Sequence, residues 1–344
     1  MNVVLVPKKW YMFRVFCICF STLRYIKGGA FLKEKLKTFF AVCVLIVTIP
    51  YIVTLLFQGI ETSPNPEKVN NTTEGTLPFT VKTDGQELDV EEYLAGIVAE
   101  EIPLDGQPEA IKAQAVIART ELLRALDTEG QELPESMSRE EMLNLWGQDG
   151  FEKNYQVLEE ALQTTKGEIL TYEGKPIWAA FHAVSAGKTR TAKEALGVEQ
   201  PCLDSVDSTV DIPSPDYLKV IFITKNELAA KLNQAYPDAK LNEEEIVEQI
   251  SVGKRDSGDY ALEVQIGETS ISGEDFRNCL GLNSACFFLK EVEEEVRIVT
   301  KGLGHGLGLS QYGASEMAKE GASYKEILQY YYQNAEIAKE NGHT

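Results

Sequence analysis

Histidine and cysteine are scarce in this sequence. Three histidines occur in 344 residues, and of the six cysteines only Cys202, Cys279 and Cys286 lie beyond residue 43. An odd number in this larger part argues against a disulfide framework, although the sequence leaves open whether Cys279 pairs with Cys286. A nucleophilic serine or cysteine would find few histidine partners, and no G-x-S-x-G turn is present. Disulfide-rich scaffolds and serine or cysteine hydrolases are therefore disfavoured.

Charge is distributed unevenly along the chain. The formal charge is −20, yet residues 1–38 contain eight Lys or Arg and a single acid, so the remaining residues carry −27. A short basic head before an acidic body does not fit a protein that binds nucleic acid. The acidity of the body indicates a solvated surface and says nothing about its substrate.

Residues 39–60 contain no charged residue and are long enough as a helix, at about 1.5 Å per residue, to cross a bilayer. Lysines directly before them predict a cytoplasmic segment at 1–38, one transmembrane helix at 39–60 and a body outside the cell membrane. A cleaved signal peptide is the alternative, but the run is long and no A-x-A site follows. A further hypothesis concerns residues 1–38: translation starts near Leu32, and the residues before it are not part of the protein.

The part beyond the membrane divides into three segments. Residues 61–78 are rich in Pro, Asn, Thr and Glu and predict a linker. Residues 79–337 form the folded body, and residues 338–344 form a tail. The body opens with a strand and turn at residues 78–85, and Asp89 then caps a helix, with Glu92 completing a capping box.

This first helix places one carboxylate of a neighbouring pair on its apolar face. Pro103 ends the helix, and Glu101 is the next residue along the stripe, whereas Glu100 is rotated by about 100° toward solvent. We expect partial desolvation to raise the pKa of Glu101, which suits a proton donor near neutral pH. The alternative is a structural carboxylate paired with a Lys or Arg. The stripe consists of Val90, Leu94, Ile97 and Val98.

A second helix is predicted from Pro108 to about Leu126, because proline suits the first helical turn. Lys112 and Arg119 lie seven residues apart on one face, together with Thr120. These two cations could orient Glu101 or bind an anionic substituent of a sugar. The alternative is a solvated surface, which is usual for Lys and Arg.

The rest of the body mixes helices and antiparallel strands without a regular βαβ alternation. We therefore predict a mixed α+β fold in a single extracytoplasmic domain, with a smaller lobe formed from residues 210–300. The predicted elements are a short helix within 128–150, a helix at Gln156–Thr164, a hairpin of strands Ile169–Tyr172 and Ile177–Ser185, a helix at Lys225–Tyr236, a strand at Tyr260–Ile266, a short helix within Ile271–Ser284 and a last helix at Ser323–Tyr332.

The stretch Gly302–Ala314, GLGHGLGLSQYGA, is the most unusual in the chain. Four glycines alternate with other residues, which allows the backbone to approach another group closely. The polar side chains in this stretch predict a surface that binds a polar polymer or ligand. The alternative is a glycine-rich turn with a structural histidine, and the spacing does not match a nucleotide-binding G-x-G-x-x-G loop. The polar side chains are those of His305, Ser310, Gln311 and Tyr312.

Three blocks of the sequence resemble the SpoIID/LytB family. The first is Val90–Thr120, the second is FHAVSAGKTRTAKEAL followed by SVDS within Phe181–Ser208, and the third combines ISGEDFRNCLGL, GLGHGLGLSQYGA and EILQYYYQNAEI. Together they span residues 79–337. The resemblance implies a peptidoglycan lytic transglycosylase that acts during engulfment of the forespore in sporulation.

The resemblance also implies a substrate, partners and a set of site residues. Family enzymes cleave between N-acetylmuramic acid and N-acetylglucosamine in glycan strands stripped of stem peptides. The implied partners are an amidase/endopeptidase and a membrane protein of the engulfment complex, and no cofactor is expected. Glu101 becomes the catalytic acid, and the candidate substrate-binding residues are Lys112, Arg119, Thr120, Ser185, His305, Ser310, Gln311 and Tyr312.

One carboxyl group suffices for this reaction, whereas ordinary glycosidases use two. The 6-hydroxyl of the muramic acid attacks in place of water, so the product ends in a 1,6-anhydro sugar. Glu101 would first protonate the leaving oxygen and then accept the hydroxyl proton. The apolar surroundings supply the necessary pKa, as a glutamate in a hydrophobic pocket of lysozyme illustrates for another fold.

The sequence departs from the family pattern in two places. Ser185-Ala186-Gly187 stands where S-x-G-G is common, which leaves the role of Ser185 less certain. Some relatives hold a structural zinc, but His182 and Cys202 are the only candidate ligands here, and two do not close a site, so we expect no metal. Two further interpretations are a non-catalytic, glycan-binding modifier of a cell-wall amidase and a purely structural anchor.

Overall fold

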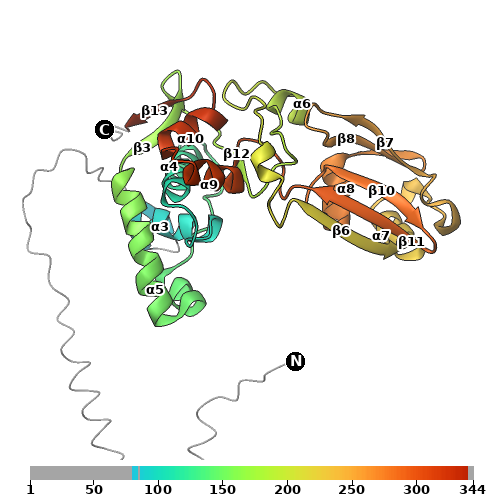
Figure 1. Cartoon of the computed structure of the whole chain (residues 1–344), viewed down its shortest axis with the longest axis horizontal. Coiled ribbons are helices and arrows are strands. Elements are labelled where there is room, and N and C mark those ends of the chain that lie inside the picture. The colour runs from blue at the N-terminus through green and yellow to red at the C-terminus, as the bar shows by residue number, and fades with distance from the viewer. Residues whose placement is uncertain (1–79, 84–85, 340–344) are drawn as a thin grey trace, which may run out of the picture. The chain divides into compact units, whose positions relative to one another are not determined.

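The computed structural model describes residues 80–83 and 86–339, all within the second of two compact units, residues 73–344. The predicted cytoplasmic segment, transmembrane helix and linker lie outside the described residues, as do residues 340–344 of the tail. Within the described part, no helix is both long and apolar enough to cross a membrane. The described residues form helices and mostly antiparallel sheets, which confirms the mixed α+β class (Figure 1).

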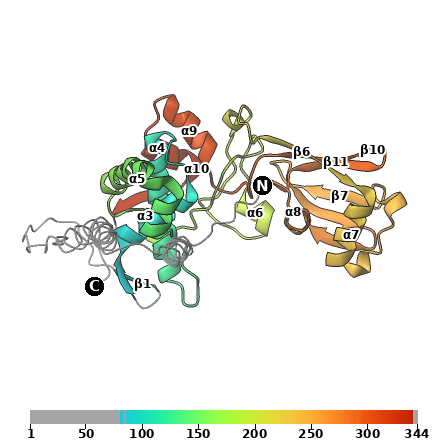
Figure 2. The same ribbon diagram turned by 90° about the horizontal axis from the view of Figure 1, so that it is seen from below.

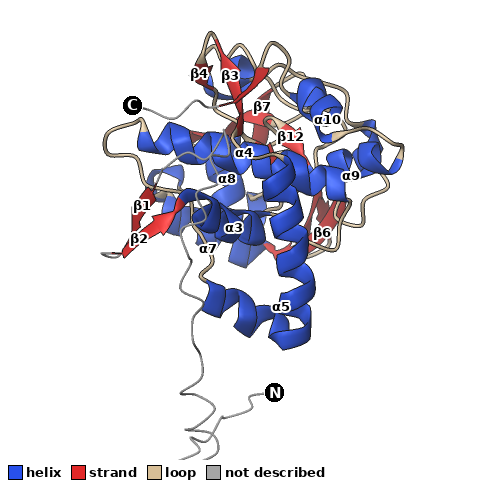
Figure 3. Ribbon diagram, turned by 90° about the vertical axis from the view of Figure 1, so that its left-hand side faces the viewer, coloured by secondary structure: helices blue, strands red, loops and turns tan. Residues whose placement is uncertain are grey.

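The first half of the unit is built around the buried helix α4 (Pro108–Leu126). The hairpin of β1 (Thr80–Thr83) and β2 (Gln86–Asp89) leads into α3 (Val90–Glu101), which packs on α4 (Pro108–Leu126) and α5 (Arg139–Thr164) (Figures 1 and 3). The predicted stripe of α3 is buried, and it shares an apolar cluster with α4 and α5. The predicted bounds of α4 are confirmed.

One local prediction for this half needs correction. Instead of a capping box with Glu92, the Asp89 carboxylate accepts a hydrogen bond from the backbone N–H of Glu91 at 2.8 Å. The two helices predicted between residues 128 and 164 are the two limbs of α5, which are separated by a kink at Gly147, where φ is 68°. The second limb begins directly after this kink and therefore earlier than the predicted Gln156.

The segments that follow α5 join distant parts of the chain. The β3 strand (Glu168–Tyr172) pairs with β4 (Lys175–Pro176) and with β13 (Glu336–Lys339). The short β5 (Phe181–His182) pairs in parallel with β12 (Leu309–Ser310), which leads into α9 (Gln311–Lys319) and α10 (Tyr324–Tyr331). The predicted last helix at Ser323–Tyr332 is therefore confirmed, with Ser323 as its cap.

The predicted second strand of the hairpin, Ile177–Ser185, was wrong: the strand that pairs with β3 is β4, which had been predicted as part of the turn. Ile177 still donates to the carbonyl of Leu170, but the N–H of Ala179 donates to the Glu121 carboxylate at 2.5 Å. The carbonyl of Ala180 then accepts from Leu309 N–H. The chain therefore leaves β3 and pairs with the glycine-rich stretch, a long-range partner that local pattern cannot reveal.

A smaller lobe with its own apolar core is formed by residues within 210–300, as expected. It contains two three-stranded sheets, in the strand orders β10–β11–β6 and β7–β8–β9 (Figure 2). Helix α7 packs on β6 and β11 of the first sheet, and α8 packs on β8 and β9 of the second. The predicted helix at Lys225–Tyr236, strand at Tyr260–Ile266 and helix within Ile271–Ser284 are confirmed. The elements are β6 (Leu218–Thr224), α7 (Lys225–Ala235), β7 (Ile250–Arg255), β8 (Ala261–Ile266), β9 (Thr269–Ser272), α8 (Gly273–Leu280), β10 (Phe287–Val292) and β11 (Glu295–Lys301).

A buried arginine ties this lobe to the second sequence block. Arg190, which precedes α6 (Ala192–Leu196), donates to Asp256 at 2.6 Å and to Glu274 at 2.7 Å. Its guanidinium also lies 4.7 Å from the centre of the Tyr260 ring. Cys279 and Cys286 do not pair in the described structure, where each thiol is free.

We predict that Gly308→Ala lowers the free energy of unfolding by at least about 3 kcal/mol, because φ is +68° and a Cβ there would meet the Ala180 carbonyl oxygen at 1.7 Å. Gly321→Ala is the matched control, since its φ is +99° but nothing lies within 4 Å of the added carbon. This control should lose only about 1–2 kcal/mol. Equal losses in chemical denaturation of the two variants would contradict the close approach of β12 to β5.

Candidate active site

The glycine-rich stretch packs against the protein's own chain. Gly302, Gly304, Gly306 and Gly308 all have positive φ, and an added Cβ at each would lie within 3 Å of another atom. Those atoms belong to residues 180–186 and to Tyr260. The predicted close approach of the backbone is therefore made to other parts of this protein. For these four glycines, this supports the alternative of a structural, glycine-rich turn.

Glu101 lies at the last position of α3 and is half-buried, whereas Glu100 is exposed, as predicted. The Gln114 side chain of α4 donates from Nε2 to Glu101 Oε2 at 2.8 Å. Gln311, the first residue of α9, donates from Nε2 to the backbone oxygen of Glu101 at 2.7 Å. The first and third sequence blocks therefore meet at Glu101.

Burial raises the pKa of the Glu101 carboxyl to about 7. The hydrogen bond from Gln114 opposes this shift, and the nearby negative charge of Glu121 adds to it. The position at the C-terminal end of α3 acts in the same direction, because a helix C-terminus disfavours an added negative charge. A carboxyl group with this pKa can donate and recover a proton near neutral pH.

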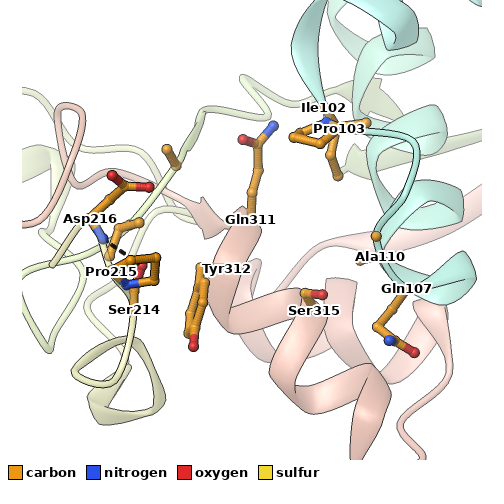
Figure 4. A pocket seen from close by; sticks show the side chains of 13 residues that line it. Ile102, Pro103, Gln107, Ala110, Ser214, Pro215, Asp216, Gln311, Tyr312 and Ser315 are labelled. Carbon is orange, nitrogen blue, oxygen red and sulfur yellow. Dashed lines mark hydrogen bonds between the residues drawn. The ribbon is translucent and has the colours of Figure 1, made fainter.

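A cleft of about 270 Å³ lies beside this residue. Ile102, Pro103 and Gln107 follow α3 on one side, and Ser214–Asp216 lie on the other, with Gln311 and Tyr312 between them (Figure 4). Glu101 itself does not line the cleft, but the next two residues, Ile102 and Pro103, do, and so does Gln311, which donates to its backbone oxygen. Small-molecule sites have volumes of about 300–1,000 Å³, and the cleft is close to the lower end of this range. Because it is small and open, it suits one section of an extended ligand.

Ser185 and Ser310 meet at a buried carboxylate that was not predicted from the sequence. Asp211 accepts hydrogen bonds from the Ser185 N–H at 2.8 Å and from the hydroxyls of Ser310 and Ser208, at 3.0 and 3.1 Å. Burial raises the pKa of Asp211, and these hydrogen bonds oppose the shift. Ser310 also caps α9. Both serines are fully buried, and neither lines the cleft.

The structure gives Lys112, Arg119 and Thr120 partners other than Glu101. Lys112 forms an ion pair with Glu109 at 2.7 Å. Arg119 is buried, so the solvated alternative does not apply to it, and it donates to Glu91 and to backbone oxygens after α5. The Thr120 hydroxyl accepts from Leu170 N–H at 2.9 Å. Arg119 and Thr120 thus tie α4 to its neighbours.

His305 lies beside a second histidine and not beside the acid. Its Nδ1 accepts from Leu307 N–H at 3.0 Å, and its ring lies 5.9 Å from that of His182. Burial lowers the pKa of both imidazoles, that of His182 to about 3. Among the described residues, no hydrogen bond or ring contact joins His305 to Glu101.

His182 and Cys202, the only candidate zinc ligands named in the sequence, each have other surroundings in the structure. His182 Nδ1 lies 3.0 Å from the Leu307 carbonyl, and Cys202 is part of an apolar cluster. Within residues 80–83 and 86–339, no group of three or more His, Cys, Asp or Glu is arranged to hold a metal ion. The polar side chains that line the cleft are those of Gln107, Ser214, Asp216, Gln311, Tyr312 and Ser315.

Comparison with known proteins places the chain in a family. The sequence model described as SpoIID, stage II sporulation protein, matches residues 82–172. Stage II sporulation protein D of Bacillus amyloliquefaciens is 34% identical over 329 residues, which cover 86% of this chain and 93% of that protein. The Bacillus subtilis (strain 168) protein of the same name is 32% identical over 339 residues, covering 90% and 96%. The chain belongs to the SpoIID family.

SpoIID membership indicates a role in sporulation and agrees with the resemblance carried by the three blocks. A more distant relative, the amidase enhancer of Bacillus subtilis (strain 168), is 26% identical over 290 residues, which cover 70% of this chain and 39% of that protein. The matched residues 82–172 include Glu101 and Gln114, whereas Gln311 lies outside them.

Two residues of the site, Gln114 and Asp211, were not predicted from the sequence. The signal for Gln114 was present: a polar side chain on the apolar face of a helix, among alanines, must find a buried partner. Asp211 follows the SVDS block by only three residues, but nothing local distinguishes it from an exposed acid. Its role depends on the folding back of β12, which brings Ser310 to it.

We predict that the wild type loses stability relative to Glu101→Gln as the pH rises from about 4.5 to 7. The folded pKa is raised to about 7 from 4.5, so folding favours the protonated form. This contribution is fully present below pH 4.5 and is lost as the pH passes 7, by about 3 kcal/mol. Chemical denaturation at a series of pH values measures it, and a difference that does not change with pH would contradict a desolvated Glu101.

Proposed function

We propose that this SpoIID family member is a lytic transglycosylase that cleaves peptidoglycan glycan strands between N-acetylmuramic acid and N-acetylglucosamine. The observation that carries the proposal is the half-buried Glu101 carboxyl, with its pKa raised to about 7, in a residue whose two successors line an open cleft. Denuded strands are the proposed substrate, and forespore engulfment is the proposed setting. Membership of the family supports the sporulation role, and the reaction is our extension of it.

The proposed reaction needs only one carboxyl group. Glu101, protonated, donates its proton to the glycosidic oxygen as the bond from that oxygen to C1 of the muramic acid breaks. The Glu101 carboxylate then accepts the proton of the muramic acid 6-hydroxyl while that oxygen bonds to C1. The product carries a 1,6-anhydro end, and Glu101 is again protonated. Water is not consumed.

Gln311 and Tyr312 are the proposed substrate contacts, because both line the cleft. The Tyr312 N–H donates to the Ala183 carbonyl at 3.0 Å, which fixes its backbone to the second sequence block. An aromatic ring next to amide groups suits a sugar, which presents apolar faces and hydroxyl groups. Lys112, Arg119, Thr120, Ser185, His305 and Ser310 act, in this proposal, through the packing that holds the cleft.

We further propose that residues 39–60 anchor the chain in the cell membrane with the body outside. In this arrangement an amidase/endopeptidase supplies the denuded strands, and a membrane protein of the engulfment complex holds the chain at its site. The similarity to an amidase enhancer favours a second candidate function, a glycan-binding modifier of an amidase without catalysis of its own. Glu101 would then be a binding residue.

The test is digestion of denuded glycan strands by the full-length protein, with the products identified by mass spectrometry. We expect 1,6-anhydro ends from the wild type, and a loss of at least about 100-fold in rate for Glu101→Gln, because general acid catalysis contributes about 10²–10⁴-fold. Glu100→Gln is the matched control and should retain the wild-type rate, since its side chain is exposed on the same helix.

Two results would contradict the proposal. Reducing ends that incorporate oxygen from labelled water would indicate hydrolysis and a second catalytic group. Strands that bind to the wild type and remain intact, with weaker binding to Glu101→Gln than to Glu100→Gln, would favour the non-catalytic modifier.

A further inference from the structure

The Glu101 carboxyl accepts a hydrogen bond from a single side chain among the described residues. We infer that Gln114 is the positioning residue of the acid, because its amide determines which carboxyl oxygen carries the proton. The inference rests on the proposed function and adds to it a residue that never touches the substrate. Gln114 is fully buried and does not line the cleft, so its side chain contacts neither solvent nor a ligand bound there.

The orientation of the Gln114 amide follows from a chain of donors that begins at a backbone group. The carbonyl oxygen of Glu101 can only accept, so the group of Gln311 that lies 2.7 Å from it must be the NH₂. The same NH₂ lies 3.3 Å from the Gln114 side chain, which must therefore present its oxygen there. The remaining end of the Gln114 amide, its NH₂, then faces Glu101 Oε2 at 2.8 Å.

An NH₂ donor at Oε2 has consequences in both protonation states of Glu101. In the neutral acid, Oε2 must be the accepting carbonyl oxygen, which leaves the proton on Oε1. No described residue donates to or accepts from Oε1, so this oxygen remains free for the substrate. In the carboxylate, the same hydrogen bond stabilises the charge at Oε2 and keeps Oε1 ready to recover the proton.

The sequence around Gln114 supports a role beyond packing. The neighbouring positions of α4 are small or apolar, and a polar side chain buried among them is costly unless it is hydrogen-bonded. Both polar ends of Gln114 are used, and both lead to Glu101, one directly and one through Gln311. Gln311 therefore fixes the orientation of the Gln114 amide, and the NH₂ group of Gln114 in turn fixes which oxygen of Glu101 accepts a hydrogen bond.

Gln114→Met tests this inference because it keeps the approximate shape and removes the donor. We expect kcat to fall by about 10- to 100-fold, since the acid loses its fixed orientation. We also expect the alkaline limb of the pH profile of kcat to move up by about one pH unit, because a hydrogen bond that lowers the pKa of Glu101 is lost. A variant that is damaged only structurally would lose rate without a shift of this limb, and that result would overturn the inference.

Gln311→Met provides a second variant, which lies at the cleft and leaves the core intact. It should shift the alkaline limb in the same direction but by less, because the Gln114 amide can then rotate. In the double variant, the alkaline limb of the pH profile of kcat should lie at the same pH as in Gln114→Met alone, since Gln311 acts on proton transfer through Gln114. Additive shifts in the double variant would show that the two amides act separately and would overturn the proposed chain of donors.

An infrared titration of the Glu101 carboxyl separates this inference from the proposed function. If the wild type releases no anhydro ends, the proposed function fails, yet the carboxyl band of Glu101 can still be followed with pH in the wild type and in Gln114→Met. A higher pKa in Gln114→Met supports the positioning contact. An equal pKa in the two proteins overturns it, whatever the activity.

Discussion

Removal of the Glu101 carboxyl from water is the constraint on which the site depends. The stripe of α3 is buried over its whole length, so its last member is drawn toward the core together with the apolar residues before it. Pro103 and the extended backbone of Ile102 then turn the chain away into the cleft wall. The carboxyl is left half-buried at the end of a helix, where burial, the helix terminus and Glu121 all favour its neutral form.

The rest of the fold brings together, around Glu101, residues from segments that are distant in the sequence. The buried helix α4 supplies Gln114, and the parallel pairing of β12 with β5 delivers Gln311 at the start of α9. That pairing requires Gly308, because a side chain there would collide with the Ala180 carbonyl. The glycine-rich stretch thus contributes to the site by allowing close packing, while Gln311 and Tyr312 face the cleft.

Local physical rules predicted much of this arrangement. The alternation of Glu100 outward and Glu101 inward followed from helix periodicity, and the bounds of α4 followed from Pro108 and the apolar pattern. The lobe within residues 210–300 and its helices were also predicted. The failures involved contacts between distant segments: the strand after Pro176 left its hairpin because Glu121 and Leu309 bind its backbone, and Asp211 became central only through Ser310. Arg119 was a candidate to orient the acid or to bind a sugar substituent, and the structure pairs it with Glu91, which no helical pattern of α4 alone could indicate.

The most direct test of the account is the protonation state of Glu101 itself. The infrared difference spectrum between the wild type and Glu101→Gln isolates the stretch of one protonated carboxyl group. The account predicts that this band persists until the pH approaches about 7, because burial raises the pKa of Glu101 from 4.5 to about that value. Loss of the band near pH 4.5 would show that Glu101 is solvated, and would contradict the account.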